Sequence, residues 1–244
     1  MGTISPRAQA RIAGILYLII VVAGLFSEGF VRGRIIVSGD AAGTAANILA
    51  FELLYRLGGA AEFVTISCDI AVAVLLYQLL KPVNRTLALM AAVFRLIFCA
   101  VYAPLSLMHF MPLIFLHGGS NLSGFSETQL QTFTMLSFKA HNLGYQMSLV
   151  FFGVHCLLIG GLIACSRFLP RALGVLLAIA GACYVFNSFV NMIAPPFGAL
   201  LFPYILLPGF VAELCLALWL TIVGLNARHW QAQNDVVEQK AWLD

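Results

Sequence analysis

Residues 143–165 read LGYQMSLVFFGVHCLLIGGLIAC and contain no Asp, Glu, Lys or Arg. A helix needs about 20 apolar residues to cross the hydrocarbon core of a bilayer, and this stretch supplies them. The rest of the chain has the same character, because 61% of its 244 residues are hydrophobic and 9% are charged. Soluble domains carry about 25% charged residues. The sequence therefore predicts an integral membrane protein.

Hydropathy predicts further spans on both sides of this stretch. The predicted spans are residues 12–31, 57–80, 87–116, 143–165, 172–193 and 204–225. We expect an all-α membrane protein, a six-transmembrane-helix bundle with short interfacial helices on the outer side. Residues 1–226 are predicted to form a single transmembrane domain, and residues 227–244 a short cytoplasmic polar tail. Pro104 and Pro112 are expected to kink or end the overlong third span.

Local signals predict where two outer helices begin. Ser38, Gly39 and Asp40 are typical of a turn and helix cap before an amphipathic segment, residues 41–54, that we expect to lie at the membrane interface. Ser126 and Gln129 fit a capping box that opens a helix continuing into the fourth span. Gly174, followed by alanines at four-residue spacing, indicates a face for close helix packing.

Basic residues indicate the orientation of the spans, since they are enriched in cytoplasmic loops. With the N-terminus inside, eight basic residues are cytoplasmic: Arg7, Arg11, Lys81, Arg85, Arg167, Arg171, Arg228 and Lys240. The four outside are Arg32, Arg34, Arg56 and Lys139. Both termini are therefore predicted to be cytoplasmic. No basic tract with interleaved aromatics favours nucleic acid as a partner, and no pattern indicates an oligomeric state.

Four segments carry a resemblance to a known family. They are Ala10-Arg11-Ile12-Ala13-Gly14, the stretch from Phe30 to Ala42, Lys81-Pro82-Val83-Asn84-Arg85-Thr86-Leu87-Ala88, and the stretch from Phe152 to Arg171. With these segments the chain resembles bacterial membrane proteins of the domain-of-unknown-function family 4386, over most of its length. The resemblance implies a multi-span protein of a bacterial inner membrane and no particular chemistry.

Three ionisable residues are predicted to lie at one depth near the bilayer midplane. Counting about 1.5 Å per residue from the cytoplasmic ends places Asp69, Arg95 and His155 at similar heights. Each ionisable group costs about 2.5–3.5 kcal/mol at the centre of a span. We expect Asp69 and Arg95 to form an ion pair and His155 to join it. This network either locks helix packing or takes part in catalysis or proton relay.

A second polar set is predicted toward the outer face. Its members are Glu28, Glu62, His109, His141, Tyr145, Tyr184, Asn187, Asn191 and Glu213. Many recur at helical spacing, which favours stripes facing a shared interior cavity over stripes facing lipid. We expect Glu62, His141, Tyr184 and Glu213 to converge on one water-filled pocket open to the outside. At least one of the two glutamates should then be protonated or be compensated by His141 or a cation.

Three functions are compatible with these patterns. The leading hypothesis is binding or transport of a small polar or amphiphilic ligand in the outward-open pocket. The second is a metal-dependent hydrolase acting on lipid, with Glu62, His141 and Glu213 as weak metal candidates, and the third is a structural or accessory membrane subunit. His109 and His141 could also ligate haem. No motif identifies a cofactor, and whether the protein is an enzyme is left open.

Overall fold

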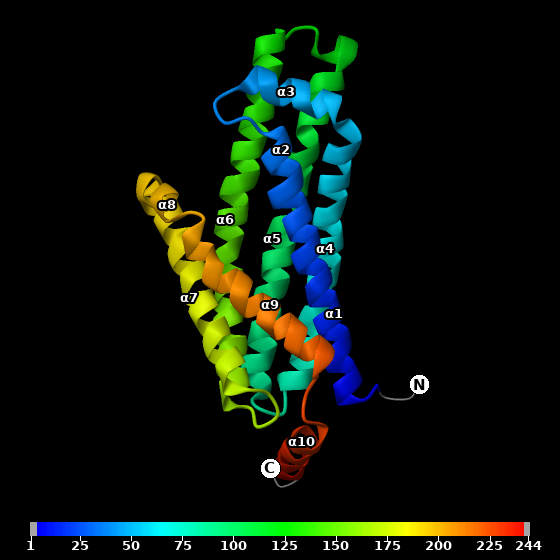
Figure 1. Cartoon of the computed structure of the whole chain (residues 1–244), viewed down its shortest axis with the longest axis vertical. Helices are drawn as coiled ribbons and strands as arrows, with labels where there is room; N and C mark the ends of the chain where they lie inside the picture. Colours follow the sequence, from blue (N-terminus) through cyan, green and yellow to red (C-terminus); the bar gives the residue numbers. More distant parts are fainter. Residues whose placement is uncertain (1–3, 242–244) are drawn as a thin grey trace. The chain divides into compact units, whose positions relative to one another are not determined.

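The computed structural model describes residues 4–241, which form helices and no strands. Six helical segments are long and apolar enough to cross a membrane. They are Pro6–Ile35, Glu52–Leu80, Arg85–His117, Glu127–Cys165, Arg171–Ile193 and Tyr204–Ile222 (Figure 1). This confirms the predicted all-α membrane fold with six spans, each of which includes most of a run expected from hydropathy.

The chain folds as two compact units that are interleaved along the sequence. Unit 1 is formed by Met1–Ile19, Cys68–Cys99 and Gln146–Asp244, and unit 2 by Ile20–Ser67 and Ala100–Tyr145. Four helices contribute residues to both units: α1 (Pro6–Gly24), α4 (Glu52–Leu80), α5 (Arg85–His117) and α6 (Glu127–Cys165).

In unit 1, α7 (Arg171–Ile193) and α9 (Leu207–Ile222) lie side by side, joined through the short helices α8 (Pro195–Leu201) and η3 (Tyr204–Leu206) (Figure 1). Close packing of α6 on α7 depends on glycine. A Cβ added to Gly160 would lie 2.6 Å from the carbonyl oxygen of Gly174 and 2.7 Å from the nitrogen of Ala178. The small-residue face predicted at Gly174 therefore contacts a neighbouring helix, as in other membrane bundles.

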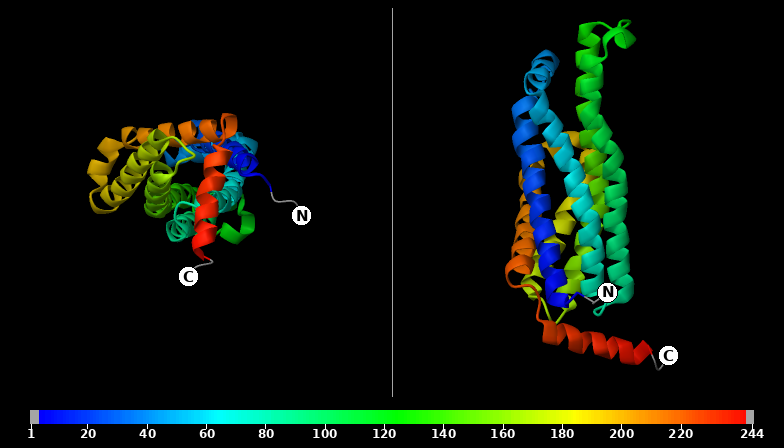
Figure 2. Two further views of the ribbon diagram at one scale, coloured as in Figure 1. Left: turned by 90° about the horizontal axis from the view of Figure 1, so that it is seen from below. Right: turned by 90° about the vertical axis from the view of Figure 1, so that its right-hand side faces the viewer.

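The polar tail of unit 1 is helical. Helix α10 (Ala227–Ala241) turns away from the direction of α9, as both views of Figure 2 show. Its Trp230 donates an indole hydrogen bond to the carbonyl oxygen of Leu79 at the end of α4, at 2.8 Å. The backbone nitrogen of Asn226 donates to the carbonyl oxygen of Phe168 at 3.2 Å. These two contacts fix the start of α10 against the helix ends of unit 1.

The first span passes into unit 2 at Ile20, continues beyond its predicted end at residue 31, and changes helix type on the way. After α1, residues Leu25–Arg32 form the π-helix η1, and Gly33–Ile35 form the helical turn α2. π-helical turns are uncommon and occur often at functional sites. Because the span runs on to Ile35, Arg32 lies within it, where the hydropathy pattern had predicted an outer loop.

Both predicted helix starts of unit 2 are confirmed. The Asp40 carboxylate accepts a hydrogen bond from the backbone nitrogen of Gly43 at 2.8 Å, and caps α3 (Ala41–Ala50), which is drawn across the end of α2 in Figure 1. At the start of α6, Ser126 and Gln129 exchange the two bonds of a capping box, at 2.8 and 3.3 Å. The amphipathic segment is shorter than predicted, since α4 already begins at Glu52.

Neither proline ends the third span, so that part of the expectation is wrong. Helix α5 continues through Pro104 and Pro112 to His117. Without water to compete for backbone groups, neighbouring protein groups keep a proline-containing span helical. The short helix η2 (Gly119–Leu122) follows. The apolar core of unit 2 is formed by Val31, Ile35, Ile48, Tyr55, Leu113 and Phe138.

Candidate functional site

A fully buried arginine lies at the centre of the polar network in unit 1. Arg95, on α5, is 0% exposed, and its Nε donates a hydrogen bond to Oδ1 of Asp69, on α4, at 2.8 Å. A second guanidinium nitrogen donates to the same carboxylate oxygen. The structure thus places the two predicted partners in direct contact. Charge-assisted bonds of this kind are about twice as strong as neutral ones.

The remaining guanidinium nitrogen of Arg95 has neutral acceptors. It lies 3.0 Å from Nε2 of His155 and 3.4 Å from the hydroxyl oxygen of Tyr17. Nδ1 of His155 donates to the carbonyl oxygen of Ala91 at 2.8 Å, so Nε2 is the acceptor and the imidazole is neutral. The rings of Tyr17 and Phe152 cover the guanidinium at 4.7 and 5.3 Å. Asp69 is therefore the anion that compensates Arg95.

Unit 1 also contains a buried carboxyl group whose hydrogen-bond partner is a phenol. The Tyr184 hydroxyl donates to Glu213 at 2.5 Å, joining α7 to α9. Gly209 makes room for this contact, because a Cβ there would lie 2.2 Å from the Tyr184 hydroxyl. Among residues 4–241, no arginine, lysine or histidine forms an ion pair with Glu213. Arg95 and Asp69 act on it only through their electrostatic fields.

The asparagines of α7 extend this polar face. Asn187, which is 1% exposed, donates from its side-chain amide to Gln146 of α6 at 2.8 Å. Asn191 donates to the side-chain and main-chain oxygens of Asn187 at 3.0 and 2.8 Å. Both asparagines were predicted to line the outer pocket, and both are occupied in bonds between and along helices.

Unit 2 contains a second buried arginine cluster. The Arg32 side chain is 10% exposed, and one of its nitrogens lies 2.9 Å from the Glu62 carboxylate and 2.9 Å from Nε2 of His141. Glu28, one helical turn earlier, adds an ion pair at 3.1 Å. His141 also lies 3.3 Å from Glu62. The buried charge of Glu62 is therefore compensated by Arg32, with His141 in contact.

His109 joins this cluster from α5 and is held by a reciprocal pair of hydrogen bonds. Its Nε2 donates to the carbonyl oxygen of Tyr55 at 3.0 Å, and the Tyr55 hydroxyl donates to the carbonyl oxygen of His109. The two rings stack with centroids 4.3 Å apart. Nδ1 of His109 lies 3.5 Å from Glu62. Tyr145 contacts the ring of Tyr102, at 5.2 Å.

Several buried polar atoms of unit 2 have no hydrogen-bond partner. They are Oγ of Ser27, Oγ of Ser106 and Nδ1 of His141, together with Nε of Arg32 and Nδ1 of His109, which lie 3.1 and 3.5 Å from carboxylate oxygens. Ser27 lies in the π-helix beside Glu28, and Ser106 lies one turn before His109 on the same face of α5. Buried polar atoms are normally paired, and an unpaired one costs about 1–3 kcal/mol. The described part of unit 2 therefore contains buried polar atoms whose hydrogen bonds are incompletely satisfied.

The donor arrangement gives no support to a metal centre. Within residues 4–241, no group of three or more His, Cys, Asp or Glu side chains is placed to hold a metal ion. Of the weak candidates, Glu62 and His141 are in contact, but one nitrogen of the Arg32 cation lies 2.9 Å from each of them, and Glu213 belongs to unit 1. No observation therefore favours the metal-dependent hydrolase.

The structure brings the predicted site residues together in three groups. Asp69, Arg95 and His155 form one, Glu62 with His109 and His141 a second, and Tyr184 with Glu213 a third. Convergence of the second and third on one pocket stays a prediction. Sequence reasoning missed Arg32 and Tyr17. The four-residue spacing of Glu28 and Arg32 was a signal for the former, because such a pair extends a helix face.

The sequence pattern of the family described as "Domain of unknown function (DUF4386)" matches residues 12–224. The chain belongs to the DUF4386 family. An "Uncharacterized protein" of Archaeoglobus fulgidus is 28% identical over 164 residues, which cover 66% of this chain and 80% of that protein. No solved structure matches. Both arginine clusters of this DUF4386 protein lie inside the matched residues, whereas Arg7 and α10 lie outside them.

Proposed function

We propose that this DUF4386 protein lies in a bacterial cytoplasmic membrane, where it binds a small polar or amphiphilic ligand or transports that ligand across the membrane. The observation that carries the proposal is the presence, in unit 2, of buried polar atoms without a hydrogen-bond partner among the described residues, in addition to the buried charges of Arg32 and Glu62. A bilayer offers no water to such atoms, and each unsatisfied group there costs several kcal/mol. A cluster that served only to hold helices together would gain nothing from leaving them unpaired.

The chemistry of the cluster describes the ligand that would fit it. Arg32 presents a cation, Glu62 an anion, and Ser27 and Ser106 hydroxyl groups that both donate and accept. A ligand with a carboxylate, amine or hydroxyl group can satisfy several of these at once. The π-helix that carries Ser27 and Arg32 supports the same interpretation, since such segments are often found at binding sites.

Orientation and membrane are part of the proposal. The excess of basic residues at the predicted inner ends favours cytoplasmic termini and a binding site that opens to the outside.

A binding screen with a matched control tests the proposal. The protein, in lipid nanodiscs, is melted in the presence of a panel of short carboxylates, amines, polyols and lysophospholipids. We expect at least one compound to raise Tm, and the combined variant Ser27→Ala and Ser106→Ala to lose that shift with little change in its own Tm, because neither hydroxyl has a partner. The control is Ser137→Ala, whose hydroxyl already donates to Phe133 at 3.0 Å.

Flux of the stabilising compound into proteoliposomes then separates a transporter from a binding protein. A shift that survives removal of both hydroxyls, or a panel that produces none, would reject this site.

A further inference from the structure

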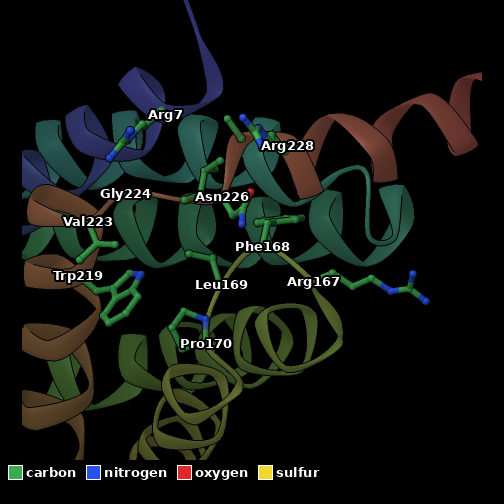
Figure 3. A pocket seen from close by; sticks show the side chains of 12 residues that line it. Arg7, Arg167, Phe168, Leu169, Pro170, Trp219, Val223, Gly224, Asn226 and Arg228 are labelled. Carbon is green, nitrogen blue, oxygen red and sulfur yellow. The ribbon is translucent and has the colours of Figure 1, made fainter.

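A cavity of about 740 Å³ lies at the end of unit 1 where the predicted cytoplasmic loops meet. Its walls are the first turn of α1, the loop between α6 and α7, and the segment that joins α9 to α10 (Figure 3). Three arginines line it, Arg7, Arg167 and Arg228, and its described lining contains no acidic residue. Its volume is within the range of small-molecule sites, roughly 300–1,000 Å³.

The three arginine side chains of this cavity are available to bind an anion. All three arginines are exposed, and none forms an ion pair with a described carboxylate. In Figure 3, Arg7 and Arg228 lie on the side of Gly224 and Asn226, while Arg167 extends from the opposite loop. The lining of the cavity thus has three arginines, each from a different segment of the chain.

The cavity is built by local structure. Gly224 has φ +76, a conformation that favours glycine, and a Cβ there would lie 3.2 Å from Cγ of Arg7. Arg7 thus packs directly over the turn that ends α9. Asn226 and Trp230 hold the following segment in place through their hydrogen bonds to Phe168 and Leu79. These contacts fix the wall that carries Arg228.

One wall of the cavity continues into an apolar surface on α9. Trp219 and Val223 line the cavity and are 36% and 43% exposed, and Ile222 beside them is 67% exposed. These side chains belong to a predicted span, where exposed apolar surface faces acyl chains. Tryptophan is enriched at this level of the membrane. A ligand with an anionic head and an apolar tail satisfies both the arginines and the α9 surface.

We propose that this cavity binds the phosphate-bearing headgroup of an anionic glycerophospholipid from the cytoplasmic leaflet, with the acyl chains along Trp219 and Val223. Arginine donates bidentate hydrogen bonds to phosphate oxygens. Basic pockets at this membrane level recognise anionic headgroups. A free phosphate compound shares the headgroup chemistry, but it leaves the apolar wall unused. The site is independent of the Arg32 cluster, which belongs to unit 2.

Lipid titration followed by native mass spectrometry tests the assignment. The detergent-solubilised protein is titrated with phosphatidylglycerol and, separately, with phosphatidylcholine. We expect preferential retention of phosphatidylglycerol, with a loss of about fivefold in affinity for each of Arg7→Gln and Arg228→Gln. The control Arg85→Gln removes an exposed arginine from the same unit outside the cavity and should bind as the wild type does.

Two results would overturn the proposal. If the Arg7→Gln and Arg228→Gln variants retain phosphatidylglycerol as well as the Arg85→Gln control, the cavity is not a headgroup site. If free glycerol 3-phosphate competes as strongly as the lipid at equal concentration, the site recognises a soluble phosphate compound and the lipid assignment is wrong. Equal Tm values for the variants and the wild type without added lipid exclude misfolding as the cause of a loss.

Discussion

Replacing Arg95 by glutamine should destabilise the protein by about 3–5 kcal/mol, because it leaves the buried Asp69 carboxylate without its cation. Asp69 is 2% exposed and Arg95 is 0% exposed, so water cannot solvate the charge that either replacement leaves unpaired. The Asp69→Asn variant should cost a similar amount, since His155 and Tyr17 are neutral acceptors that cannot balance the guanidinium charge. Each single replacement therefore exposes the full cost of one unpaired charge.

The double replacement removes both charges together. Its cost should fall short of the sum of the single costs by about 2–3 kcal/mol, at the upper end of coupling energies between contacting residues. The free energy of unfolding is measured for the wild type, the two single variants and the double variant. Unfolding is induced in mixed micelles by increasing dodecyl sulfate and followed by circular dichroism. Arg85→Gln, at an exposed position of the same helix, should change stability by less than about 0.5 kcal/mol.

Additivity would refute this reasoning. If the two single effects sum to that of the double variant within about 0.5 kcal/mol, the charges do not stabilise one another and the contact is incidental.

Three further outcomes are expected. Gly160→Ala should destabilise the protein by about 1–3 kcal/mol in the same unfolding assay, because the added Cβ would lie 2.6 Å from the backbone of α7. The control Gly161→Ala should be neutral or slightly stabilising, because a Cβ there has no neighbouring atom within 4 Å. Arg32→Gln should cost about 3–5 kcal/mol by stranding a buried carboxylate, and equal stability of Arg32→Gln and the exposed control Arg34→Gln would contradict this. Alkaline phosphatase fused after Asp244 should be inactive and a fluorescent-protein fusion bright, and activity of the phosphatase would reverse the predicted orientation.

Composition and helix geometry were sufficient to predict the spans and one buried network. The absence of charge over a bilayer-length stretch predicts a span regardless of what packs beside it. Counting the rise per residue from the helix ends gave similar depths for Asp69, Arg95 and His155, and the structure has them in contact. The depth of a residue in the membrane depends only on its position along its own helix, so it can be predicted from the sequence.

Lateral contacts were harder to predict. Tyr17 is as compatible with lipid as with a guanidinium, so nothing in its own segment identified it as a partner of Arg95. Arg32 was assigned to a loop, because the apolar run ends just before it. The true end of the span depended on the partners available to that arginine, Glu62 and His141, which are distant in sequence. Such pairing depends on tertiary packing, and the local sequence gives little indication of it.

The π-helix between Leu25 and Arg32 has a consequence for chain length. A π-turn holds one residue more than an α-turn, so removing a single residue here can be absorbed by a return to α-helical hydrogen bonding. The helix on either side then keeps its rotation about the axis. One residue added or lost elsewhere in a span turns everything beyond it by about 100°. Relatives that differ from this chain by a one-residue gap inside the first span should therefore carry that gap in this segment.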